Sequence, residues 1–180
     1  TVIQFELESD KALFTSAMEF AQKQVKHLVD RHPDYYPLYT KEGKWKHDGP
    51  QWTHWCDGFL PGMMWLFRRH NAEHGRASDA KFWLEQAIRY TKPLEPRKHD
   101  RDVHDLGFIF MNTFHRWYQL TGDKDQNDVV IQAGRTLALR YKEKGQYLRS
   151  FVSDDSIFID IMMNVGIIFY AAQQTNDINL

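Results

Sequence analysis

The stretch His104-Asp105-Leu106-Gly107-Phe108 puts an aspartate directly before an apolar run of helical character. The same design occurs twice more, in Asp57-Gly58-Phe59-Leu60-Pro61-Gly62 and in Ile159-Asp160-Ile161-Met162-Met163-Asn164. The three aspartates recur at spacings of 48 and 55 residues. A regular return of an aspartate to the start of a helix indicates stacked helix pairs whose aspartates gather at one rim.

The hydrophobic pattern on either side of these segments predicts helices along most of the chain. The first, third and fifth have one apolar and one charged face, whereas the second, fourth and sixth are apolar nearly all round. A helix apolar on every side is buried between other elements, so an outer and an inner helix alternate three times. The expected helices cover about residues 12–31 (capped by Ser9 and Asp10), 58–74, 79–91, 105–120, 126–144 and 157–174, with a long irregular loop over 33–53 and an extended stretch over 147–152.

This pattern predicts an all-α fold, part of an (α/α)6 barrel or toroid. Such a toroid usually needs six helical hairpins, and the chain supplies about three. Residues 176–180 resemble the entry to a further helix. An inner helix without its neighbours exposes apolar flanks. We therefore expect residues 1–180 to form part of a single domain, which a remaining half-barrel or a partner chain completes.

The composition narrows the class of partner. The net charge is −1 and no run of five like charges occurs, which argues against nucleic acid or an anionic membrane as the main partner. No apolar run of 18 residues predicts a membrane span. The first ten residues do not resemble a signal peptide, and Cys56 is the only cysteine. These features favour a cytoplasmic location, or a periplasmic one if a leader was removed.

Two carboxylates at one rim are what an acid-catalysed sugar hydrolase needs. The alternative is structural, because an aspartate at a helix start caps free N–H groups and complements the helix dipole. The neighbours of Asp160 are apolar, and we expect burial there to raise its pKa. A carboxylic acid still protonated near neutral pH serves as a general acid.

Other motifs carry competing interpretations. His70-Asn71-Ala72-Glu73-His74 fits an inverted zinc-protease pattern, but it falls in the last turn of its helix, where the dipole favours histidine. His104 is either a loop residue hydrogen-bonded to its neighbour or a substrate contact. The residues Trp45, Trp52, His54 and Trp55 lie in or beside the long loop and form either a packed lid or a platform for a sugar ring.

Three segments in order resemble glycoside hydrolase family 88, the unsaturated glucuronyl hydrolases. Residues 55–66 are similar to the family's W-x-x-G-F-x-x-G-x-x-W-L. Residues 104–108 match its H-D-[IL]-G-F, and residues 159–164 match its I-D-x-[LM]-[LM]-N. The order and spacing agree over nearly all 180 residues, which would make this chain the N-terminal half of the barrel.

The resemblance implies an unusual hydrolysis. The family's substrate is an oligosaccharide left by a polysaccharide lyase, with a C4=C5 double bond in its terminal uronic acid. Protonation of this vinyl ether at C4 gives an oxocarbenium-like cation, and water adds at C5. The hemiketal then opens and the glycosidic link breaks. Cleavage at C1 by paired carboxylates does not apply.

The matching positions imply roles for five residues. Asp160 is the expected proton donor and water activator, and Asp105 its essential partner. Trp55 matches a tryptophan that stacks on the sugar, and His104 is the next expected substrate contact. A family tryptophan is replaced here by Phe151, so that stacking contact is weakened or moved. We expect no cofactor and no metal.

Two other functions stay open at this point. The related unsaturated rhamnogalacturonyl hydrolases share the fold and the paired aspartates, although they fit the first motif less well. A non-catalytic helical-repeat scaffold would use the same aspartates only as helix caps.

Overall fold

The computed structural model describes residues 2–48 and 51–180, with side chains described for 10–48 and 54–180. The chain forms two compact units, Thr1–Tyr35 and Tyr36–Leu180. The first unit holds one long helix, α1 (Val2–Arg31). This helix begins ten residues before the predicted start, so Asp10 lies inside the helix and does not cap it. The side chain of Ser9 lies outside the described residues.

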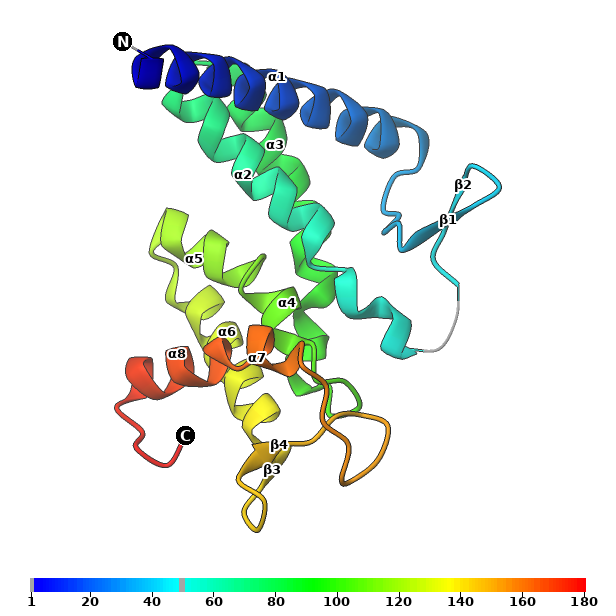
Figure 1. Cartoon of the computed structure of the whole chain (residues 1–180), viewed down its shortest axis with the longest axis vertical. Coiled ribbons are helices and arrows are strands. Elements are labelled where there is room, and N and C mark those ends of the chain that lie inside the picture. The colour runs from blue at the N-terminus through cyan, green and yellow to red at the C-terminus, as the bar shows by residue number, and fades with distance from the viewer. Residues whose placement is uncertain (1, 49–50) are drawn as a thin grey trace. The chain divides into compact units, whose positions relative to one another are not determined.

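The second unit contains all the other elements (Figure 1). Two short antiparallel strands, β1 (Tyr39–Lys41) and β2 (Lys44–Lys46), form a hairpin in the segment predicted to be irregular. The elements that follow are η1 (Gln51–Cys56), α2 (Phe59–Glu73), α3 (Ala77–Thr91), η2 (Lys92–His99), α4 (Leu106–Phe110), α5 (Phe114–Thr121), α6 (Lys124–Ala138), the strand pair β3 (Tyr141–Lys142) and β4 (Tyr147–Leu148), α7 (Ile161–Asn164) and α8 (Gly166–Thr175).

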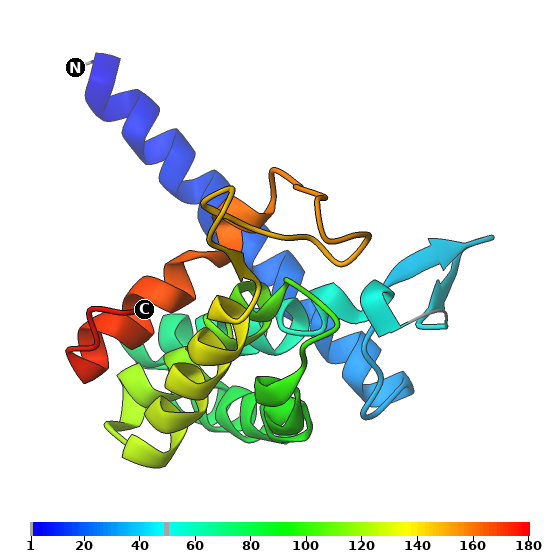
Figure 2. The same cartoon turned by 90° about the horizontal axis from the view of Figure 1, so that it is seen from below.

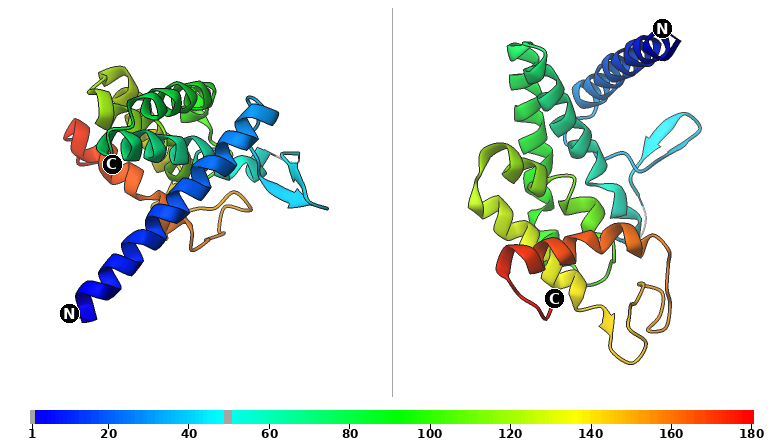
Figure 3. Two further views of the ribbon diagram at one scale, coloured as in Figure 1. Left: turned by 90° about the horizontal axis from the view of Figure 1, so that it is seen from above. Right: turned by 60° about the vertical axis from the view of Figure 1, so that its left-hand side comes forward.

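Neighbouring helices of the second unit pack against one another. Helices α2 and α3 run side by side, and α8 packs against α6 (Figures 1 and 3). Apolar side chains of α2 to α8 form the core of the second unit, and the members named below are almost wholly buried. Burial of these side chains stabilises the fold by about 25 cal/mol for each Å² of apolar surface that is removed from water. The largest are Met64, Tyr90, Leu106, Ile109, Phe110, Phe114, Leu137 and Ile167.

Glycines bring the starts of successive inner helices into contact. A β-carbon on Gly58 would lie 2.6 Å from the carbonyl oxygen of Phe108, and one on Gly107 would lie 2.6 Å from the Cα atom of Asn164. Real side chains do not approach so closely, so only glycine fits at either position. The inner helices therefore converge at the end where the aspartates lie.

The fourth predicted helix, 105–120, is broken into α4 and α5. The Thr113 hydroxyl donates to the carbonyl oxygen of Ile109 at 2.7 Å, and the Asn112 amide donates to that of Phe108 at 2.8 Å. Such side chains compete with the helical backbone bonds, and Thr113 leaves the helical region with φ −118° and ψ −89°.

The last two predicted helices were drawn too long. The helix predicted over 126–144 ends at Ala138, and the hairpin β3–β4 follows it. The helix predicted over 157–174 starts only at Ile161, after a broad loop at residues 149–160 that Figure 2 shows beyond the hairpin. One face of α8 is exposed, as the 66% exposure of the Phe169 side chain shows. No helix in the described part of the chain combines the length and apolarity needed to span a bilayer.

Candidate active site

The structure brings His104, Asp105 and Asp160 together. His104 Nε2 lies 3.2 Å from Asp160 Oδ2 and 3.6 Å from Asp105 Oδ1. The His104 ring and the Asp105 carboxyl are buried, and the Asp160 side chain is 41% exposed. An ionised carboxylate only accepts hydrogen bonds, so His104 Nε2 carries the N–H when both carboxylates are ionised. Two residues 55 positions apart thus meet at one imidazole.

Neither aspartate acts as a helix cap through its side chain. Asp105 is the residue before α4 and Asp160 the residue before α7, yet the carboxylate of neither accepts a capping hydrogen bond. By contrast, Asp123 does cap α6, because its carboxylate accepts from the backbone N–H of Asp125 at 3.0 Å. Capping of helix N–H groups by the side chains of these two aspartates is therefore contradicted.

Burial changes the pKa of Asp105. Burial raises the pKa of its carboxyl from 3.8 to about 6, opposed by the positive potential of His104 and reinforced by the charge of Asp160. More distant Arg97 and Arg140 lower that pKa. Two carboxylates at such close range do not readily ionise together. The pair is arranged to hold a proton close to neutral pH.

The apolar environment predicted around Asp160 is not found. Ile159 is 82% exposed and Met162 70% exposed, and the Asp160 side chain itself reaches solvent. The apolar neighbours in sequence point outward because only Ile161 and Asn164 of α7 are buried. The sequence therefore located the carboxylate pair, but it assigned the buried member to the wrong residue.

Aromatic rings enclose the imidazole. The Phe151 ring stacks on His104 with centroids 5.1 Å apart, and the Phe158 ring meets His104 edge-on at 5.8 Å. His104 Nδ1 is buried and has no hydrogen-bond partner among the described residues. Phe151, predicted as a substrate contact, packs on the histidine that joins the carboxylates. The packing fixes the plane of the imidazole.

Trp55, the predicted stacking residue, belongs to a cluster of three rings. Its ring centroid lies 5.8 Å from that of Phe59 and 5.6 Å from that of Phe108. Trp55 keeps 38% of its surface exposed, so one part of the indole is open for a ligand. Trp45 is half exposed on β2, and the side chain of Trp52 lies outside the described residues.

The third aspartate of the repeat has different partners. Asp57 accepts from His47 Nε2 at 2.9 Å, and Arg97 Nη1 lies 3.5 Å from its other oxygen. Asp57 therefore pairs with a partly buried cation and does not join the pair at His104. The adjacent thiol of Cys56 has its pKa raised to about 11, mainly by burial and by the charge of Asp57. A thiol so reluctant to ionise is a poor nucleophile.

The zinc-protease pattern at 70–74 is not assembled as a site. His70 Nε2 faces Arg76 Nη2 at 3.1 Å, and Glu73 pairs with Arg69 at 3.5 Å. His74 Nδ1 bonds the carbonyl oxygen of His70 within the helix turn. Within the described residues, groups of three side chains whose possible metal-ligand atoms lie within 4.8 Å of one another occur elsewhere. These groups are His47–His54–Asp57 and His104–Asp105–Asp160.

The comparisons with known proteins agree with this geometry. No protein-family model matches the chain. The chain is 26% identical over 175 residues to the unsaturated chondroitin disaccharide hydrolase of Streptococcus pyogenes serotype M1, covering 91% of this chain and 41% of that one. It is 30% identical over 129 residues to the unsaturated glucuronyl hydrolase of Formosa agariphila, covering 68% and 30%. The crystal structure of unsaturated glucuronyl hydrolase from Streptococcus agalactiae superposes with a TM-score of 0.73 at 26% identity, covering 91% and 41%.

The chain is similar to the unsaturated glucuronyl hydrolases of glycoside hydrolase family 88 over 91% of its length. The predicted resemblance is confirmed, and so is the α/α barrel as the fold of which this chain forms a part. The chain spans about two fifths of the length of the curated relatives first matched, at 41%, 32% and 40%.

Two residues that the sequence analysis missed connect the segments of the site through hydrogen bonds to the backbone. Arg140 is buried and donates to the carbonyl oxygens of Arg101, Arg149 and Ser150 at 2.6, 3.0 and 2.6 Å. It thus ties the loop before His104 to the one before Phe151. Asn164 accepts from the backbone N–H of Phe108 at 2.8 Å. In the sequence, the position of Arg140 just past the end of a predicted helix and that of Asn164 in the segment 159–164 were the signals that could have indicated these roles.

Proposed function

We propose that this chain supplies the carboxylate pair of an unsaturated glucuronyl hydrolase. The enzyme releases the terminal 4,5-unsaturated uronic acid from oligosaccharides made by polysaccharide lyases. The observation that carries the proposal is the convergence of Asp105 and Asp160 on His104 Nε2, at 3.6 and 3.2 Å. The names of the similar proteins support the same substrate class, an unsaturated chondroitin disaccharide in one case.

The two carboxyls differ in access, which divides the work between them. Asp160 reaches solvent and is the proposed general acid at C4 of the vinyl ether and the base that activates water for C5. Asp105 is buried, with its pKa raised to about 6, and cannot meet bulk water. It holds a proton up to about pH 6, and His104 links the two carboxyls. General acid–base catalysis of this kind contributes roughly 10²–10⁴-fold.

Trp55 is the proposed platform for the sugar ring. Its indole is partly exposed and packs on Phe59 and Phe108, and Phe108 lies one helical turn after Asp105. Flat apolar faces of sugars pack well on an indole held in this way. A platform so close to the carboxylates orients the double bond toward Asp160.

We also propose that further helices close the barrel around this site. Ile159, Met162 and Phe169 are 82, 70 and 66% exposed, although they lie on or beside inner helices. Surfaces of this kind mark the seat of another element. The occupant is a remaining half-barrel or a partner chain, in line with the greater length of the relatives.

The test is turnover of an unsaturated chondroitin disaccharide by the native protein. The reaction destroys the C4=C5 double bond, so ultraviolet absorbance falls as it proceeds. We expect Asp160→Asn to lower the rate by roughly 10²–10⁴-fold with an unchanged circular dichroism spectrum. Asp128→Asn, which changes an exposed aspartate on α6, serves as the matched control and should retain the wild-type rate. A fully active Asp160→Asn variant would exclude the assignment, and absence of turnover in the wild type favours the scaffold.

A further inference from the structure

A group of histidine and aspartate side chains lies at the start of α2, apart from the pair at His104. His47 follows β2, His54 belongs to η1, and Asp57 lies just before α2. The possible metal-ligand atoms of these three side chains all lie within 4.8 Å of one another. Three segments of the chain thus bring three ligand atoms together.

The distances between these atoms suit a small metal ion. His47 Nε2 lies 2.9 Å from Asp57 Oδ1, and His54 Nδ1 lies 3.7 Å from Asp57 Oδ2. Nitrogen and oxygen ligands bind Zn²⁺ at about 2.0–2.2 Å in a tetrahedron, whose corners are then about 3.4 Å apart. The two observed distances lie on either side of this value, so shifts of about half an ångström or less bring both pairs to it.

The carboxylates of this region carry more charge than the nearby arginine balances. Arg97 Nη1 lies 3.5 Å from Asp57 Oδ2, and Arg97 Nη2 lies 3.3 Å from Asp100 Oδ2. The side chains of Asp57 and Asp100 are only 7 and 4% exposed, and one guanidinium cannot neutralise two carboxylates. Buried charges are paired with opposite charges or coordinate metal ions, so this region favours a further cation.

The His54 imidazole is in the form that a metal ion requires. Burial lowers the pKa of His54, and the charges of His47 and Arg97 lower it further against the charge of Asp57. A neutral imidazole presents a nitrogen lone pair, and a protonated one does not. The side chains of His47 and His54 are 20 and 29% exposed, which leaves an ion a path from solvent.

Arg97 holds the ligand residues in place from outside the group. Its Nη1 atom donates to the carbonyl oxygen of His54 at 2.7 Å and also faces the Asp57 carboxylate. Its Nε and Nη2 atoms face Asp100, so the guanidinium charge is shared with a second carboxylate. Outer partners of this kind orient metal ligands without touching the ion.

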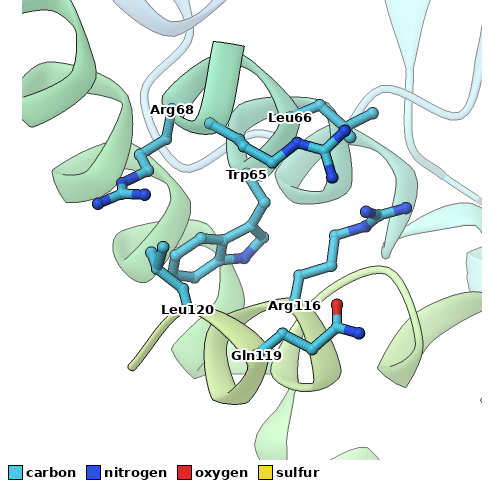
Figure 4. A pocket seen from close by; sticks show the side chains of 7 residues that line it. Trp65, Leu66, Arg68, Arg116, Gln119 and Leu120 are labelled. Atoms are coloured by element: carbon cyan, nitrogen blue, oxygen red, sulfur yellow. The ribbon is translucent and has the colours of Figure 1, made fainter. Parts of the chain in front are cut away.

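The cavity between α2 and α5 offers a contrast. It has a volume of about 310 Å³, and Arg68 and Arg116 lie on opposite sides of the Trp65 indole that lines it (Figure 4). None of the described residues that line this cavity is a histidine, a cysteine or a carboxylate. Its cations repel a metal ion, whereas the group at the start of α2 attracts one.

We propose that His47, His54 and Asp57 bind one Zn²⁺ ion, which joins the end of the β1–β2 hairpin to the start of α2. Two imidazoles and one carboxylate are a donor set typical of zinc, and water supplies the fourth ligand. Binding requires the His47 tautomer with its proton on Nδ1, because the Nε2 lone pair must face the ion. The ion has a structural role, since none of its ligands belongs to the carboxylate pair.

Isothermal titration calorimetry of the metal-free full chain with ZnCl₂ tests the proposal. We expect one Zn²⁺ ion per chain, with a dissociation constant on the order of 1 μM or tighter. His47→Gln and His54→Gln should each weaken binding by roughly tenfold or more with an unchanged circular dichroism spectrum. His74→Gln removes an exposed histidine at the end of α2 and should bind like the wild type.

Co²⁺ is the second probe, because its coordination geometry is visible in its absorption spectrum. A tetrahedral site of nitrogen and oxygen ligands makes Co²⁺ absorb visible light far more strongly than an octahedral one. We expect the strong absorption in the wild type and in His74→Gln, and its loss in His47→Gln and His54→Gln. Weak, octahedral absorption in the wild type would contradict the tetrahedral site.

Other results would overturn the proposal. Saturable heat that is absent with Zn²⁺ would do so, as would His47→Gln and His54→Gln variants that bind like His74→Gln. Loss of Zn²⁺ binding in His74→Gln would assign the ion to the zinc-protease pattern, and loss in Asp160→Asn would assign it to the active-site pair. Turnover of the unsaturated disaccharide does not enter the readout, so this test and the turnover test of Asp160 fail independently.

Discussion

His104 makes a pair out of two aspartates that lie far apart in the sequence. Its buried ring is fixed by Phe151 on one face and by Phe158 at the edge. With the ring fixed, Nε2 has one place to point, between Asp105 and Asp160. The Asp105 carboxyl is buried and the Asp160 carboxyl is exposed to solvent. The same hydrogen-bonded group therefore contains one carboxyl that retains a proton and one that can donate a proton.

The raised pKa of Asp105 predicts how stability depends on pH. The folded chain holds the Asp105 proton until about pH 6, whereas the unfolded chain releases it near 3.8. Folding therefore takes up a proton between these values, and the stability contributed by this group is lost as pH rises through about 6. Above that pH the native state carries a buried charge that unfolding would relieve.

Asp105→Asn removes this titration. Above about pH 7 we expect the free energy of unfolding of the variant to exceed that of the wild type by on the order of 1 kcal/mol. The difference is no larger because the titration of Asp105 is coupled to that of its charged neighbours. The advantage should vanish below about pH 3, where the wild-type carboxyl is protonated in both states. Urea denaturation at both pH values measures it. An advantage that is equal at both values would contradict the raised pKa.

At the scale of elements, the contact between α4 and α7 requires that residue 107 be glycine, which carries only a hydrogen atom as its side chain. A β-carbon on Gly107 would lie 2.6 Å from the Cα atom and 2.7 Å from the carbonyl oxygen of Asn164. Both are backbone atoms and cannot rotate away. Gly107→Ala should therefore destabilise the chain by about 1–3 kcal/mol or more, and it should separate Asp105 from Asp160.

Gly166 offers the matched control for Gly107. It begins α8, and a β-carbon there would meet nothing within 4 Å. Gly166→Ala should be neutral or stabilise by about 0.5–1 kcal/mol, since alanine loses less backbone entropy in a helix. Urea unfolding midpoints of both variants measure the difference. Equal midpoints would show that α4 and α7 do not touch as described.

The sequence predicted these elements where its pattern was periodic and failed where a side chain redirected the backbone. The inner and outer helices follow from apolar spacing, and α2 (Phe59–Glu73) lies within a residue of its expected bounds. The break at Thr113 and the start of α7 depend on local hydrogen bonds that periodicity does not encode. The aspartate pair was predicted from its position at helix starts. The role of Arg140 was not, because its acceptors are backbone oxygens distant in sequence.

At the scale of the whole molecule, the exposed apolar face of α8 and its neighbours calls for a further layer. Phe169 and Met163 are 66 and 72% exposed, which is unusual for an inner helix. The opposite side of α8 is buried through Ile167, Ile168 and Ala171. The helix therefore has a place in the second unit and one face left to be covered.

The 180-residue chain should therefore bind the dye 1-anilinonaphthalene-8-sulfonate at this face. Phe169→Lys removes the exposed ring of α8 and adds a charge that solvent screens, so the dye fluorescence should fall. The unfolding free energy should change by no more than about 0.5 kcal/mol, because the ring is mostly in water already. Gln173→Lys adds the same charge at an exposed polar position of α8, and it should leave the fluorescence near that of the wild type. An equal loss in both variants would assign the effect to charge alone, and no loss in Phe169→Lys would remove α8 as the surface that the rest of the barrel covers.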